Sequence, residues 1–127
     1  MESDGLNSVP NDEDFTRADT MMMERFRNLD VVEKSVLRQF KNRCPLYTVA
    51  ILPHDRHSFE AYVFFDFDLD VVASTTNGVA QAIEDFLYEE LERAGRGSRQ
   101  DVTVRFEFDS NENVLAKYHG NYGLRLR

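Results

Sequence analysis

The sequence holds one cysteine, three prolines and no tryptophan among its 127 residues. A lone Cys44 excludes an internal disulfide framework and a cysteine-based zinc site. No apolar run approaches the roughly 20 residues of a membrane-spanning helix, and residues 1–14 lack the apolar stretch of a secretory signal. These absences predict a cytoplasmic protein that has no membrane contact.

Basic residues are also scarce, with 15 Lys and Arg against 23 Asp and Glu and a net charge of −8. This balance disfavours direct binding of nucleic acid, which needs cations to neutralise phosphates. The acids are concentrated, because the segment from Asp55 to Glu92 holds ten of them and a single base, Arg56. Two interpretations stay open: a solvated surface that keeps the protein soluble, or a surface that attracts a basic partner.

What the sequence does contain is 42% hydrophobic residues, enough for one core. Residues 1–15 are polar and acidic and predict a flexible tail, followed by a single α+β domain over residues 16–127. Apolar residues at steps of three and four predict a helix to about Asn28, a second over residues 31–43 and a third over residues 79–91. Alternating or β-branched runs predict strands over residues 47–52, 59–67, 102–109 and 114–118, with residues 124–127 ending the chain.

The order of these elements predicts two hairpins on either side of a helix. We therefore expect an antiparallel sheet of four to five strands, with helices packed on one face. In the second strand, strict alternation places Phe59 and Val63 toward the core. The same alternation places Tyr62, Phe64, Asp66 and other neighbours of like parity on a mostly polar outer face.

Asp66, Asp68 and Asp70 form the sharpest local pattern of carboxylates. A calcium-binding loop is excluded, because its required Gly and Glu positions are held by Val71 and Asn77. One open alternative is a small metal-dependent hydrolase that binds a metal through Asp66, Asp68 and Asp109, or through Glu107 in place of Asp109. His54 and His57 lie in an expected turn without a paired nucleophile, so we interpret them as solvated turn residues.

The order of an N-terminal amphipathic helix, a hairpin, an acidic helix and a closing hairpin carries a resemblance to a known class of proteins, over about the last two thirds of the chain. Its basis is the alternating run 102–110, which ends in Phe-Asp-Ser, together with residues 114–118 and 121–124. This arrangement resembles the small acidic immunity proteins, or antitoxins, of bacterial contact-dependent and polymorphic toxin systems. The resemblance implies a non-enzymatic, cytoplasmic inhibitor that binds a cognate basic toxin domain, often a nuclease. It implies neither a cofactor nor catalysis.

Our leading hypothesis is thus an inhibitor that neutralises a toxin through an acidic face carrying exposed aromatic anchors. The candidate contacts are aromatic and acidic residues of the second strand and the helix that follows: Tyr62, Phe64, Asp66, Asp68, Asp70, Glu84, Asp85 and Glu89. A further alternative is a housekeeping module that self-associates through a sheet edge or through the face that carries Phe64.

Overall fold

The computed structural model describes residues 20–127. Residues 20–26 are helical, and the elements that follow are α2 (Leu29–Phe40), β1 (Leu46–Asp55), β2 (Ser58–Phe65), α3 (Asp68–Thr76), α4 (Val79–Arg93), β3 (Thr103–Ser110), α5 (Asn111–Tyr118) and α6 (Tyr122–Arg125). The acidic segment 1–15, expected to be a flexible tail, lies outside the described residues. None of the helices in the described part of the chain is long and apolar enough to cross a membrane.

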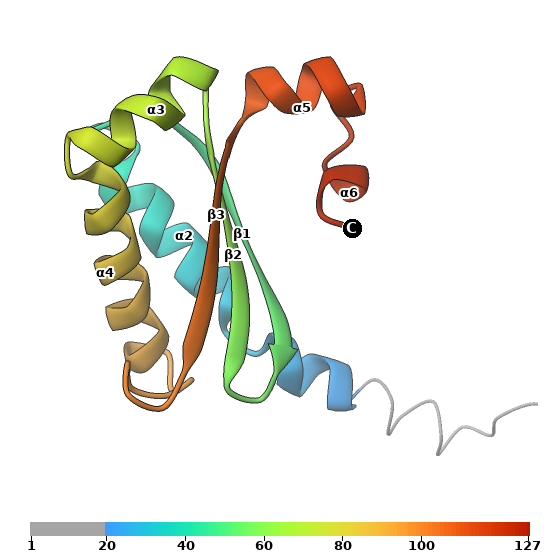
Figure 1. The fold of residues 1–127 in the computed structure, drawn as a ribbon. Coiled ribbons are helices and arrows are strands. Elements are labelled where there is room, and N and C mark those ends of the chain that lie inside the picture. Colours follow the sequence, from blue (N-terminus) through green and yellow to red (C-terminus); the bar gives the residue numbers. More distant parts are fainter. Residues whose placement is uncertain (1–19) are drawn as a thin grey trace, which may run out of the picture.

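The three strands form one mixed sheet in the order β1-β2-β3 (Figure 1). β1 and β2 form the expected antiparallel hairpin, but β2 and β3 run parallel and are connected through α3 and α4. The α+β class is therefore correct, whereas the antiparallel sheet of four to five strands is wrong. The parallel pair requires a long crossover, which the helices between β2 and β3 provide.

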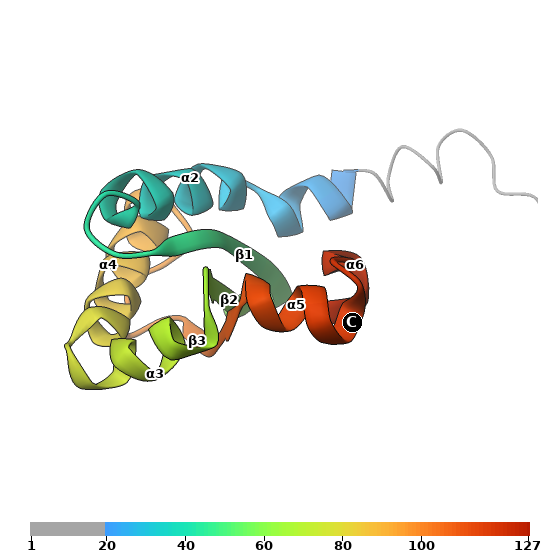
Figure 2. The same ribbon diagram turned by 90° about the horizontal axis from the view of Figure 1, so that it is seen from above.

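One face of the sheet carries the main hydrophobic core. Leu29, Val32, Val36 and Phe40 recur at helical spacing, so α2 turns one apolar stripe toward the sheet. α4 adds a second stripe, and both pack on inward-facing residues of all three strands that include Phe59, Ala61, Val63, Phe65 and Val104. Figures 1 and 2 show α2 and α4 together on this side of the sheet.

The other face is covered by α5 and α6, which lie across the sheet from α4 (Figure 2). Tyr62 and Phe64 are 5% and 0% exposed and form a second apolar cluster with Val114 of α5. The expectation that these two aromatic residues lie on a polar outer face is therefore wrong. Their side chains do point away from the main core, but the C-terminal helices bury that face as well. The expectation of helices on a single face is corrected for the same reason.

The segment expected as a fourth strand, residues 114–118, is part of α5. Ser110 begins this helix, because its hydroxyl accepts a hydrogen bond from the backbone N–H of Asn113 at 2.9 Å. His119 ends it with a φ of 53°, in the left-handed region, and Gly120 follows at 77°. A short, mostly apolar segment such as residues 114–118 fits a strand or a helix equally well, and here the capping serine favours the helix.

Candidate protein-binding surface

Three of the predicted site residues lie where β2 ends and α3 begins. Asp66 lies in the bend after β2, while Asp68 and Asp70 belong to the first turn of α3. The strand expected over residues 59–67 ends at Phe65, and the chain becomes helical at Asp68. Acids in the first turn are favourable, since the N-terminal end of a helix carries a partial positive charge.

Hydrogen bonds connect the beginnings of α3 and α5. The Asp68 carboxylate accepts a bond from the Ser110 hydroxyl, and the Glu112 carboxylate accepts one from the Asp68 N–H at 2.9 Å. The Glu112 N–H in turn donates to the Asp66 carbonyl at 3.1 Å. Within α3, the Asp70 carboxylate accepts from the N–H of Phe67 at 2.9 Å. The carboxylates of Asp68 and Asp70 therefore help to hold the chain in place where α3 and α5 begin.

Large apolar side chains surround these acids and are open to solvent. Phe67, Leu69 and Val72 are 60%, 80% and 65% exposed, and the last two share one face of α3 by their spacing of three. A shallow hollow of about 520 Å³ brings Phe67 together with Tyr47, Asp66, Asn111, Glu112, Leu115 and Ala116. Tyr47 and Leu115 are themselves 47% and 58% exposed.

We call this region the α3-end surface and define it by its apolar and acidic members: Tyr47, Asp66, Phe67, Asp68, Leu69, Asp70, Val72, Glu112 and Leu115. Sequence reasoning found the acids but missed the apolar residues. Strand alternation over residues 59–67 places Phe67 toward the core with Phe59 and Val63, whereas the structure leaves it 60% exposed. The available signal was Leu69 and Val72, which lie at helical spacing beside acids that begin a helix.

The predicted acids of α4 form a separate group. Asp85 accepts hydrogen bonds from Arg99 at 2.9 Å and from Gln81 at 3.0 Å, and these bonds hold the pKa of Asp85 below its usual value. Glu84 is half-buried, whereas Glu89 is exposed. The structure thus places Glu84, Asp85 and Glu89 on a different element from Asp66, Asp68 and Asp70.

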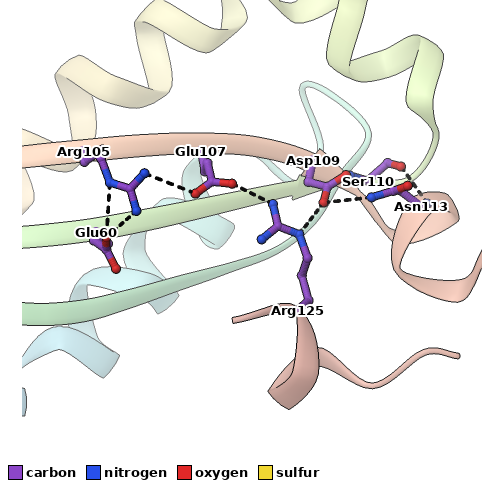
Figure 3. Close-up of polar contacts among 7 residues, drawn as sticks. All are labelled: Glu60, Arg105, Glu107, Asp109, Ser110, Asn113 and Arg125. Carbon is purple, nitrogen blue, oxygen red and sulfur yellow. Dashed lines mark hydrogen bonds and ion pairs between the residues drawn. The ribbon is translucent and has the colours of Figure 1, made fainter. Parts of the chain in front are cut away.

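A ladder of charges crosses the second face of the sheet (Figure 3). It begins with Glu60 and Arg105, continues through Glu107 to Arg125 of α6, and ends at Asp109. Arg125 donates from Nε to Asp109 at 2.6 Å and from Nη2 to Glu107 at 2.9 Å. Burial disfavours the charged guanidinium, but these two bonds outweigh it and raise the pKa of Arg125.

Arg125 also packs against aromatic rings of the second apolar cluster. Its guanidinium lies 5.5 Å from the ring centre of Tyr62 and 5.9 Å from the ring centres of Phe64 and Tyr118. Tyr122 of the same helix packs edge-on against Phe64 at 4.9 Å, and burial raises the pKa of its hydroxyl to about 12. The ion pairs of Arg125 with Glu107 and Asp109 therefore hold α6 against the face of the sheet that carries Tyr62 and Phe64.

The hydrolase alternative finds no support in this geometry. Asp109 is held by Arg125 and Asn113, and Asp68 by Ser110. Over residues 20–127, no group of three or more His, Cys, Asp or Glu side chains is arranged to hold a metal ion. Asp66, Asp68 and Asp109 therefore do not form the carboxylate centre that this alternative requires.

Cys44 follows α2 and packs partly against the main core. Its thiol donates to the Phe40 carbonyl at 3.4 Å, and burial raises the pKa of Cys44. A raised pKa keeps the thiol protonated, which disfavours a nucleophilic role.

No protein-family model, curated protein or solved structure matches the chain.

Proposed function

We propose that this chain binds a partner protein through the α3-end surface, and that the partner presents a basic surface with apolar pockets. The observation that carries the proposal is the group of five large apolar side chains, 47–80% exposed, beside four carboxylates. Apolar patches rimmed by polar groups are typical of protein interfaces. Buried aromatic and aliphatic anchors supply most of the affinity of such interfaces, and surrounding charges speed association.

The connection between α3 and α5 favours this surface as a docking site. The bonds that join Asp66, Asp68, Ser110 and Glu112 fix both helix starts before a partner arrives. A preformed surface loses less conformational entropy on binding than a mobile one. The resemblance to immunity proteins supplies the finer form of the proposal, in which the partner is a basic toxin domain and this chain is its non-enzymatic inhibitor.

The test is capture of partners from the native cell by the tagged full chain. We expect a single stoichiometric basic protein, retained in dilute buffer and lost in about 0.5 M salt, where charge attraction is screened. Phe67→Ala should weaken its affinity by at least about tenfold, the usual loss when a buried anchor is removed.

Phe26→Ala is the matched control, because Phe26 is 46% exposed and lies in the helical stretch 20–26, away from the α3-end surface. It should leave capture unchanged. Equal capture by the wild type and the Phe67→Ala variant would contradict the proposal. Capture of further copies of this chain alone would favour the self-associating module instead.

A further inference from the structure

Arg96 is a buried cation in the loop that follows α4. It is 7% exposed and lies between Gly95 and Gly97, whose φ values of 80° and 122° favour glycine. Its Nη1 donates to the backbone carbonyls of Arg25 at 3.1 Å and Arg27 at 2.7 Å. Its guanidinium also lies 4.9 Å from the ring centre of Phe59.

No carboxylate within residues 20–127 forms an ion pair with this guanidinium. Burial and the neighbouring Arg27 both lower the pKa of Arg96. Glu24 favours its charge, but Glu24 is itself paired with Arg27 at 3.2 Å. Arginine has five N–H donors, and the two bonds to carbonyls engage Nη1 alone. A buried cation is costly without a counter-charge, and the described residues supply none to Arg96, which points to an anion that completes the site.

Arg96 lines a groove of about 970 Å³ at the end of the sheet where β1 turns into β2. The groove gathers further cationic and imidazole side chains, so that its lining includes Arg25, Arg27, Arg56, Arg96, His54 and His57. We call it the arginine groove. The turn between β1 and β2 and the start of α3 lie at opposite ends of β2 (Figure 1). The arginine groove is lined by residues of that turn, so it is separate from the α3-end surface.

The acids that line the arginine groove are already engaged. Glu24 pairs with Arg27, Asp55 accepts from the N–H of His57 at 2.9 Å, and Asp101 accepts from the Ser98 hydroxyl at 2.8 Å. The Arg56 side chain, by contrast, has no hydrogen bond or ion pair to any residue in the described part of the chain. Within residues 20–127, three guanidinium groups of the groove, those of Arg25, Arg56 and Arg96, have no carboxylate partner, and Arg25 donates to the His54 carbonyl at 3.4 Å.

We propose that the arginine groove binds a small phosphorylated ligand. At pH 7 a phosphate monoester carries about −1.5 to −2 charges and a diphosphate carries more, so either offsets more than one guanidinium group, whereas a single carboxylate offsets one. The planar fork of arginine donates paired hydrogen bonds to phosphate oxygens. The volume of the groove is within the range of small-ligand sites.

A purely structural role explains only part of these contacts. The bonds from Arg96 to the carbonyls of residues 25 and 27 attach the helical stretch 20–26 to the loop after α4. They use one of its three nitrogens, and they do not involve Arg56, which lines the same groove and has no carboxylate partner within residues 20–127. An anionic ligand accounts for both.

The test is calorimetric titration of the full chain with inorganic pyrophosphate, with succinate at equal ionic strength as a carboxylate comparison. We expect saturable one-to-one binding of pyrophosphate with a dissociation constant below about 1 mM, and at least about tenfold weaker binding of succinate. Arg56→Gln should weaken pyrophosphate binding by at least about fivefold, because it removes a charged donor from an exposed side chain.

Arg38→Gln is the control, since Arg38 is an exposed arginine of α2 outside the groove and the substitution changes the net charge equally. Its affinity should match that of the wild type. Arg96→Met should abolish binding, and Arg56→Gln keeps the test decisive if that variant does not fold. Absence of saturable pyrophosphate binding, equal binding of succinate, or equal losses in the Arg56 and Arg38 variants would each overturn the proposal.

Discussion

Phe64→Ala is expected to lower the free energy of unfolding by about 3–5 kcal/mol, because it removes a fully buried ring and leaves a cavity. Phe64 lies on the second face of the sheet, stacked on Tyr62 and edge-on to Tyr122. Its loss therefore removes contacts with both β2 and α6. A sheet with a single packed face would leave this residue in solvent, and the same substitution would then cost little.

Phe67→Ala is the matched control for this prediction. The same substitution three residues further along removes a ring that is 60% exposed. We expect the free energy of unfolding to change by less than about 0.5 kcal/mol. Urea titration of both variants measures the difference. Similar losses at the two positions would contradict the burial of Phe64 beneath α5 and α6.

Arg125→Met is expected to cost about 2–4 kcal/mol, because it leaves a nearly buried carboxylate without its cation. Asp109 has a side chain that is 14% exposed and would keep only its bonds to Ser110 and Asn113. Glu107 is more exposed and keeps its ion pair with Arg105. Most of the lost stability therefore comes from the unpaired carboxylate of Asp109. Methionine keeps an unbranched apolar stem at this position, and it removes the charge of Arg125 together with its hydrogen bonds and its contacts with the aromatic rings.

Arg105→Met supplies the comparison at the exposed end of the same ladder. Arg105 is 62% exposed and pairs with Glu60, so its replacement should cost less than about 1 kcal/mol. Adding Asp109→Asn to Arg125→Met should restore part of the lost stability, since no unpaired charge then remains. Equal effects of the Arg105 and Arg125 variants would show that α6 is not fastened by a buried ion pair.

Much of the first half of the chain is predictable from periodicity. The helical stripe that ends at Phe40, the hairpin of β1 and β2, and the helix from Val79 all occur where the sequence places them. The faces of β2 were not predictable by alternation, because both faces are buried. The continuous apolar run Ala61–Tyr62–Val63–Phe64–Phe65 is the signal of such a strand, and it is typical of strands with a parallel neighbour.

The C-terminal elements illustrate why short apolar runs mislead. Val114, Leu115 and Ala116 suit a strand by composition, but Ser110 caps a helix that contains them. The missing fourth strand changes the topology, because β3 then has no hairpin partner and pairs in parallel with β2. The pairing of Arg125 with Asp109 depends on this topology and has no local signature in the sequence.

The acidic part of the candidate site was predictable, and its anchors were not. Asp66, Asp68 and Asp70 are visible as a pattern, and they lie together at one end of the molecule. Which apolar residues accompany them depends on where the chain turns from strand to helix. That turn buries Phe65 and exposes Phe67, two residues apart.

The association rate of the captured partner tests the α3-end surface most directly. Asp66→Lys and Glu89→Lys change the net charge equally, one on this surface and one on α4. We predict that Asp66→Lys slows association about tenfold in dilute buffer, while Glu89→Lys slows it less than about threefold, and that both effects shrink in salt. If Asp66→Lys and Glu89→Lys slow association equally, or if neither changes the association rate, binding at the α3-end surface is contradicted.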